Sequence, residues 1–98
     1  MAVGAQGVIS VASNVIPREV SQMVGAFARG KARQAARLHA KFYPVFKDLF
    51  LETNPVPVKA ALAMMGVIEE EYRLPLVTMS DANRVRLKAT LKACGILK

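Results

Sequence analysis

Side chains that could act as nucleophiles or metal ligands are few in this sequence and lie far apart. Lys59 follows "NPVP" and carries an amine that could form an imine with a carbonyl compound, but no neighbouring base or cation would activate it. His39 is the only histidine and has no second ligand at metal spacing. Cys94 lies at the end of a predicted helix, where the negative partial charge disfavours a thiolate. We expect structural roles for these three residues, and we predict neither a metal site nor a cofactor.

Charged residues give a net charge of +7, from 14 Lys and Arg against 7 Asp and Glu. Such a balance is common in proteins that bind nucleic acid or an anionic membrane surface. The basic residues, however, recur every four positions along two stretches: Arg33, Arg37, Lys41, and Arg84, Lys88, Lys92. This spacing favours solvated helix faces, and we predict no nucleic-acid partner. The adjacent acids Glu69–Glu71 cannot form a positioned acid and base pair, so we expect a solvated loop there.

The apolar residues bear on whether the protein lies in a membrane, is secreted or is cytoplasmic. The longest uninterrupted apolar run, "AALAMMGVI", is half the roughly 18 residues that a membrane helix needs. The opening "MAVGAQG" lacks the features of a secretory signal, and a single cysteine fits a reducing compartment. We therefore expect a cytoplasmic protein without a membrane partner. Apolar residues make up 53% of the chain, which is more than so short a chain easily buries, so we also expect self-association.

The stretch "GVISVASN" predicts a β-strand over Val8–Val11, because β-branched residues there are bounded by Gly7 and Ser13. A strand needs a neighbour to pair its backbone groups, and no second strand is predicted. Parallel sheets are built from alternating strands and helices, and an amphipathic helix pattern follows this strand. The simplest interpretation is that the chain is part of a larger fold.

Four helical segments are predicted after the strand. The first runs from Pro17 to about Arg29, and the second lies within "KARQAARLHAKFYPVFKDLFLET", with a kink or break expected just before Pro44. The third covers about 56–65 and the fourth about 81–93, where Ser80 and Asp81 predict a helix start. Between the last two, "EEEYRLPLVTM" predicts an extended linker.

Three motifs in order, "GVISVASNVIP", "LETNPVPVK" and "YRLPL", resemble the carboxyl-terminal third of the dihydrodipicolinate synthase family. The family consists of pyruvate-dependent, Schiff-base-forming lyases and aldolases, and the resemblance covers essentially the whole chain. It implies a TIM barrel with a helical carboxyl-terminal extension. Residues 1–30 would be the incomplete last β/α unit of the barrel, and residues 31–98 the helical domain, so this chain would be mainly α. Met1 resembles an internal methionine of a longer protein.

The resemblance also implies an activity and a site. The family condenses pyruvate with aspartate-4-semialdehyde, in the pathway to diaminopimelate and lysine, through an imine on a barrel lysine and without a cofactor. Only Ile9 matches a family site residue, the isoleucine of the eighth strand whose backbone lines the pyruvate pocket. No lysine of this chain matches the Schiff-base position, and Tyr43 and Tyr72 match no relay tyrosine.

Two functions from different classes follow as hypotheses. In the first, the chain is a catalytically inactive piece of a lyase that serves folding and contacts between subunits in a homo-oligomer. In the second, it is a freestanding basic helical module that binds nucleic acid or a protein partner. The catalytic residues are expected outside this chain in either case.

Overall fold

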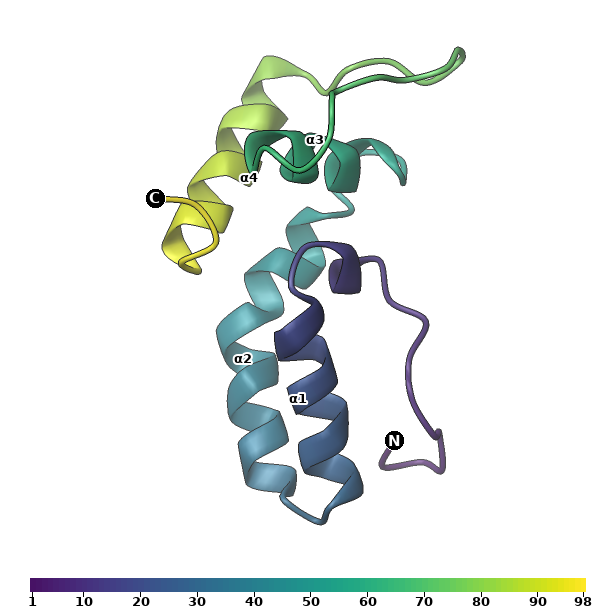
Figure 1. The fold of residues 1–98 in the computed structure, drawn as a ribbon, viewed down its shortest axis with the longest axis vertical. Coiled ribbons are helices and arrows are strands. Elements are labelled where there is room, and N and C mark those ends of the chain that lie inside the picture. Colours follow the sequence, from purple (N-terminus) through teal and green to yellow (C-terminus); the bar gives the residue numbers. More distant parts are fainter.

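The computed structural model describes residues 1–98 and consists of helices and connecting segments. The elements are η1 (Ala12–Asn14), α1 (Pro17–Ala28), α2 (Ala32–Asp48), α3 (Val56–Met64) and α4 (Asp81–Ala93). Helices α1 and α2 lie side by side and antiparallel, and α3 and α4 lie at one end of this pair (Figure 1). The prediction of a mainly α chain is therefore confirmed.

The predicted ends of α1, α3 and α4 agree with the observed ones to within about two residues. Pro17 occupies the first turn of α1, where its missing N–H costs no hydrogen bond. The Ser80 hydroxyl accepts a hydrogen bond from the backbone N–H of Asn83 at 3.4 Å and so caps α4. Gly66 and Gly95 follow α3 and α4 with φ of +73° and +75°, a conformation that glycine adopts without strain.

Helix α2 departs from its prediction, because it continues through Pro44 without a break. Pro44 donates no backbone hydrogen bond, so the carbonyl of Ala40 lacks its helical partner. Both residues lie on the exposed face of α2, where water can reach that carbonyl. On the opposite face of α2, the side chains of Phe42 and Val45 are buried in the hydrophobic core. The packing of this face offsets the lost hydrogen bond and keeps the helix whole.

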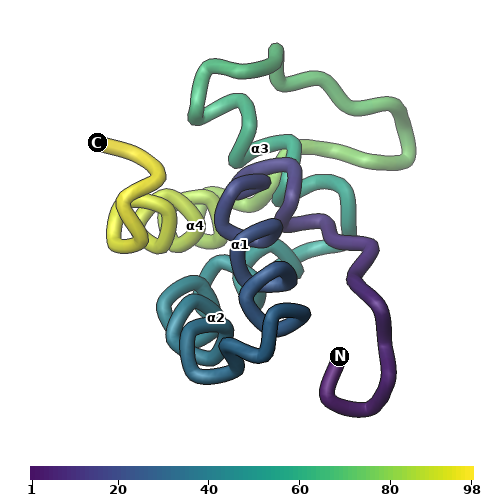
Figure 2. Tube along the Cα trace, turned by 60° about the horizontal axis from the view of Figure 1, so that its bottom comes forward, coloured from purple at the N-terminus to yellow at the C-terminus, as the bar shows by residue number.

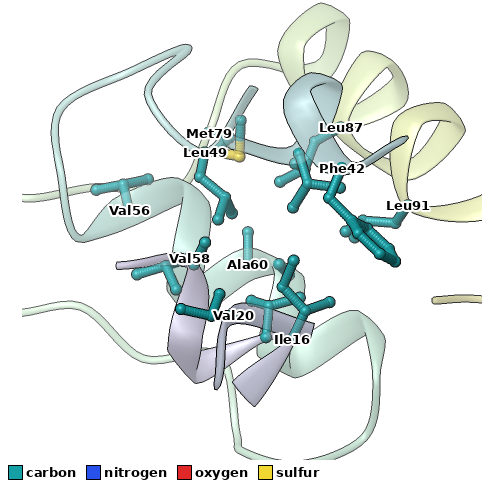
Figure 3. Packing of buried hydrophobic residues seen from close by; sticks show 14 residues of the cluster. Ile16, Val20, Phe42, Leu49, Val56, Val58, Ala60, Met79, Leu87 and Leu91 are labelled. Atoms are coloured by element: carbon teal, nitrogen blue, oxygen red, sulfur yellow. The ribbon is translucent and has the colours of Figure 1, made fainter. Parts of the chain in front are cut away.

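The hydrophobic core gathers side chains from every helix (Figure 3). Leu49, Leu87 and Leu91 are completely buried in it, together with Val45. The larger members labelled in the figure are Ile16, Val20, Phe42, Leu49, Val56, Val58, Met79, Leu87 and Leu91. The core joins the α1–α2 pair to α3 and α4, because its members come from both parts. Burial of these apolar groups is the main stabilising term for the helical part of the chain.

The segment Ala5–Ser10, called the N-terminal segment below, corrects the prediction of a strand over Val8–Val11. It has no regular secondary structure, and its backbone takes part in no hydrogen bond with another backbone group. Val11 already has helical backbone angles, with φ of −63° and ψ of −42°, and leads into η1. A strand forms only against a neighbouring strand, and residues 1–98 supply none. In Figure 1 the segment runs beside α1 with no other part of the chain on its outer side.

Candidate functional site

Ile9, the only residue that matches a family site, lies in the middle of the N-terminal segment with its side chain fully exposed. Its neighbours differ, because Ser10 is partly buried and Val8, which is 60% exposed, lines the space between the segment and the helices. Successive side chains of an extended chain point to opposite faces. The segment thus has a more covered face toward α1 and α2 and a more exposed face that carries the Ile9 side chain, although Ile9 also borders the second of the grooves described next.

Two apolar grooves separate the N-terminal segment from the helices. The first groove, with a volume of about 510 Å³, is lined by Met23 and Phe27 of α1 and by Ala36 and His39 of α2. The second groove, about 340 Å³, shares Met23 and His39 and reaches Phe46 and Phe50. Most of the other lining residues are also hydrophobic. Both grooves can bury apolar groups, and neither holds a carboxylate, lysine or cysteine side chain.

His39 is the one titratable side chain in the grooves, and it packs against other rings. Its ring centroid lies 5.8 Å from that of Tyr43 and 5.6 Å from that of Phe46. Nowhere in residues 1–98 do three His, Cys, Asp or Glu side chains gather closely enough to hold a metal ion. The grooves therefore offer apolar contact and unpaired backbone groups, and no nucleophile or general base.

Lys59 and Cys94 both lie away from the grooves. The Lys59 ammonium lies 5.3 Å from the centre of the Tyr72 ring, over which it packs as a cation. Cys94 is partly buried, and its Sγ is 3.8 Å from the carbonyl oxygen of Lys41. Burial raises the pKa of the Cys94 thiol, which keeps it in its less reactive form. Both side chains have packing roles.

Glu69 and Glu71 are exposed in a loop, as expected, but Glu70 is partly buried in a polar cluster with Tyr72 and Arg84. Arg84 donates to Glu70 Oε1 at 2.6 Å, and the Tyr72 hydroxyl donates to the same oxygen at 3.0 Å. The Arg84 hydrogen bond outweighs burial and lowers the pKa of Glu70, whereas burial and the Glu70 charge raise the pKa of Tyr72 to about 12. These bonds attach the linker that leaves α3 and returns to α4 as a wide loop (Figure 2).

A second cluster, which the sequence patterns did not indicate, joins the end of α2 to α4. Asp48 is only 3% exposed and accepts hydrogen bonds from Arg86 Nη2 at 2.9 Å and from the Thr90 hydroxyl at 2.6 Å. Burial alone would raise the pKa of Asp48, but the bonds from Thr90 and Arg86 outweigh it and lower the pKa. Asp48 thus remains charged, and the cluster holds two helices together.

The structure supports neither a membrane partner nor binding of nucleic acid. No helix is both long enough and apolar enough to cross a bilayer. The basic residues of α2 and α4 are spread along helix faces, and the apolar grooves rather than a basic cleft border the N-terminal segment. The hypothesis of a freestanding basic module is not favoured.

Comparison with known proteins finds similarity to one family. The model of the dihydrodipicolinate synthetase family matches residues 1–94. A 4-hydroxy-tetrahydrodipicolinate synthase from Sulfurihydrogenibium sp. is 50% identical over 100% of this chain and 34% of its own length. The crystal structure of dihydrodipicolinate synthase from Aquifex aeolicus matches with a TM-score of 0.94 at 48% identity, over 97% of this chain and 32% of that one.

A solved dihydrodipicolinate synthase from Thermotoga maritima gives a TM-score of 0.95 at 45% identity, over 98% of this chain and 32% of that one. The chain therefore spans about a third of the length of the relatives that it matches. Within that third the likeness runs through the N-terminal segment and all the helices, because almost every residue is covered. The chain belongs to the dihydrodipicolinate synthetase family.

Proposed function

We propose that this chain forms the carboxyl-terminal third of a 4-hydroxy-tetrahydrodipicolinate synthase, an enzyme that condenses pyruvate with aspartate-4-semialdehyde. The chain closes the barrel and adds the helical domain, while the imine-forming lysine and the proton-relaying tyrosines belong to the rest of the enzyme. By itself the chain is catalytically inactive. Its free cysteine and its place in an amino-acid pathway favour the cytoplasm.

One observation carries this proposal, which is the extended N-terminal segment without a sheet. It belongs to a chain that is similar over all of its own residues to part of a longer relative. In a TIM barrel the eighth strand pairs with the first and the seventh, and active sites lie at the carboxyl ends of the strands. The N-terminal segment has the length of such an eighth strand and its position in the chain, because only the short η1 separates it from α1. The proposed boundary between barrel and helical domain is Gly30, which follows α1 with φ of +76°.

Ile9 is the residue through which this chain contributes to the pyruvate pocket. Its side chain lies on the more exposed face of the segment, and in a closed barrel the face away from the helices points to the barrel interior. We propose that its backbone, rather than its side chain, lines the pocket. The substrate then contacts a peptide group that the neighbouring strands hold in place.

A chimera tests the proposed function. This chain replaces the matching segment of the Aquifex aeolicus enzyme, and formation of the condensation product is measured with both substrates. We expect an active chimera, whereas the Aquifex enzyme without the segment and this chain alone should both be inactive. A folded but inactive chimera would overturn the proposal, as would activity of the chain alone.

Two substitutions at Ile9 in the active chimera separate the backbone from the side chain. Ile9→Val keeps the peptide N–H and removes one methylene group, so the KM for pyruvate should change little. Ile9→Pro removes the N–H and restricts φ, so it should raise the KM or abolish activity. Equal effects of the two substitutions would contradict the proposed role of the backbone.

A further inference from the structure

We propose that this chain, supplied as a separate polypeptide, docks onto an open parallel barrel and closes it without a covalent link. The N-terminal segment would enter between two free strand edges, and the two grooves would receive apolar side chains of the neighbouring helices. The inference rests on the proposed function and names the partner of the same surface: the part of a family member that this chain does not cover. That part is most of such a protein, since the chain covers 34% of the Sulfurihydrogenibium relative.

The backbone of the N-terminal segment gives the first argument. Between Ala5 and Ser10 no backbone N–H or carbonyl is paired with another backbone group. An extended chain directs these groups to both of its edges, so both edges are unpaired from Ala5 to Ile9, while the Ser10 carbonyl accepts a hydrogen bond from the Ser13 hydroxyl. Pairing with a second copy of the chain would satisfy one edge and leave the other open. A position between two strands of a barrel satisfies both edges.

The two faces of the segment give the second argument. Val8 and Ser10 line the grooves, and Ile9 also borders the second groove, but the Ile9 side chain is fully exposed whereas Ser10 is partly buried. A barrel strand needs this arrangement, because one face contacts the helical layer and the other contacts the interior of the barrel. The helical layer is already present in this chain as α1 and α2. The interior and the neighbouring strands are what the partner must supply.

The grooves give the third argument, because they are open and apolar beside the segment. Met23 lines both of them, and their volumes of about 510 and 340 Å³ can accept several aliphatic side chains. Phe50, at the end of the second groove, is 59% exposed. Removal of such a surface from water would stabilise a complex with apolar helices.

The separate chain also has a core that does not depend on the partner. The buried cluster is formed by residues from Ala12 to Leu91 and includes none from the N-terminal segment. The helices can therefore be formed before docking, and only the segment must become ordered against the partner. This lowers the entropic cost of association.

Mixing of two purified polypeptides tests the inference. The first is this chain, and the second is the Aquifex aeolicus enzyme lacking its matching segment. Light scattering after size-exclusion chromatography measures the mass of any complex, and titration calorimetry measures its Kd. We expect a complex that contains the two polypeptides in equal numbers. Treatment of the complex with pyruvate and borohydride should add reduced pyruvate to the Aquifex portion.

Two matched pairs of variants locate the surface. Val8→Pro removes a donor from the segment and should weaken binding roughly tenfold, whereas Val3→Pro, at a more exposed position outside the segment, should not. Ala36→Glu places a charge in the first groove and should weaken binding, whereas Ala40→Glu, on the exposed face of the same helix, should not. Far-UV circular dichroism confirms the helices of each variant.

The outcomes separate this inference from the proposed function. If the covalent chimera is active but the two polypeptides do not associate, the inference is wrong and the proposed function stands. If the chain forms a homodimer that Val8→Pro abolishes, and binds no Aquifex polypeptide, the occupant is a second copy and the inference is wrong. An inactive chimera overturns the proposed function and the inference together. Equal binding by both members of each variant pair also contradicts the inference.

Discussion

At the scale of single residues, Asp48 makes the most consequential polar contacts in the chain. Its carboxylate is buried and satisfied by Arg86 and Thr90, so Asp48→Asn should lower the free energy of unfolding by about 2 kcal/mol at neutral pH. The loss stays below that of a fully buried ion pair, because the Arg86 side chain is 50% exposed and hydrated. Urea unfolding followed by circular dichroism measures the change, and Asp81→Asn, on an exposed position, is the matched control.

The same contacts predict a pH dependence. The folded protein has a lowered Asp48 pKa, so the stabilisation by this carboxylate is complete above its unfolded pKa of about 4. It is lost as the pH falls through the lower pKa of the folded state. The difference in unfolding free energy between the unsubstituted chain and Asp48→Asn should therefore shrink below about pH 4. A difference that stays constant down to about pH 2.5, roughly 1.5 units below the unfolded pKa, would contradict this account.

Tyr72 gives a second prediction at this scale, because burial and the charge of Glu70 raise its pKa to about 12. In Tyr43→Phe, Tyr72 is the only tyrosine, and the chain contains no tryptophan. Tyrosinate absorbance of this variant should rise with a midpoint near pH 12 while circular dichroism still reports helix. A midpoint near the ordinary value of about 10 in the folded chain would show that the contact with Glu70 is absent.

Local signals explain why most helices could be predicted from the sequence. Pro17, Ser80, Gly66 and Gly95 act within one turn of the helix ends that they mark, so neighbouring residues suffice to locate them. Pro44 was misjudged for the opposite reason. Whether a proline breaks a helix depends on how firmly the rest of the helix is packed, and that packing involves residues far away in the sequence.

At the scale of elements, Pro44 yields a direct prediction for α2. Pro44→Ala restores the N–H that can donate to the Ala40 carbonyl and removes the ring from the helix interior. The increase in the free energy of unfolding is reduced because alanine leaves the unfolded chain more flexible than proline does. We expect the free energy of unfolding to rise by about 1 to 2 kcal/mol in urea titrations. An unchanged or lower free energy of unfolding would show that Pro44 does not destabilise α2.

At the scale of the whole molecule, the sequence motifs predicted a strand over Val8–Val11, but the chain by itself does not form it. Its strand character depends on neighbours that residues 1–98 lack, and the absence of a second predicted strand already indicated that its backbone would be unpaired. The polar clusters escaped prediction for a related reason. Asp48 and Arg86 are 38 positions apart, and Glu70 and Arg84 are 14 apart, so no short motif contains either pair.

The central claim is that this chain completes an enzyme whose reacting lysine lies elsewhere. The most direct measurement is peptide mapping by mass spectrometry of the Aquifex chimera after treatment with pyruvate and borohydride. We predict one reduced pyruvate on a lysine of the Aquifex portion and none on any lysine of residues 1–98. A pyruvate adduct on Lys59 or another lysine of this chain, or a folded chimera that forms no adduct, would contradict the account.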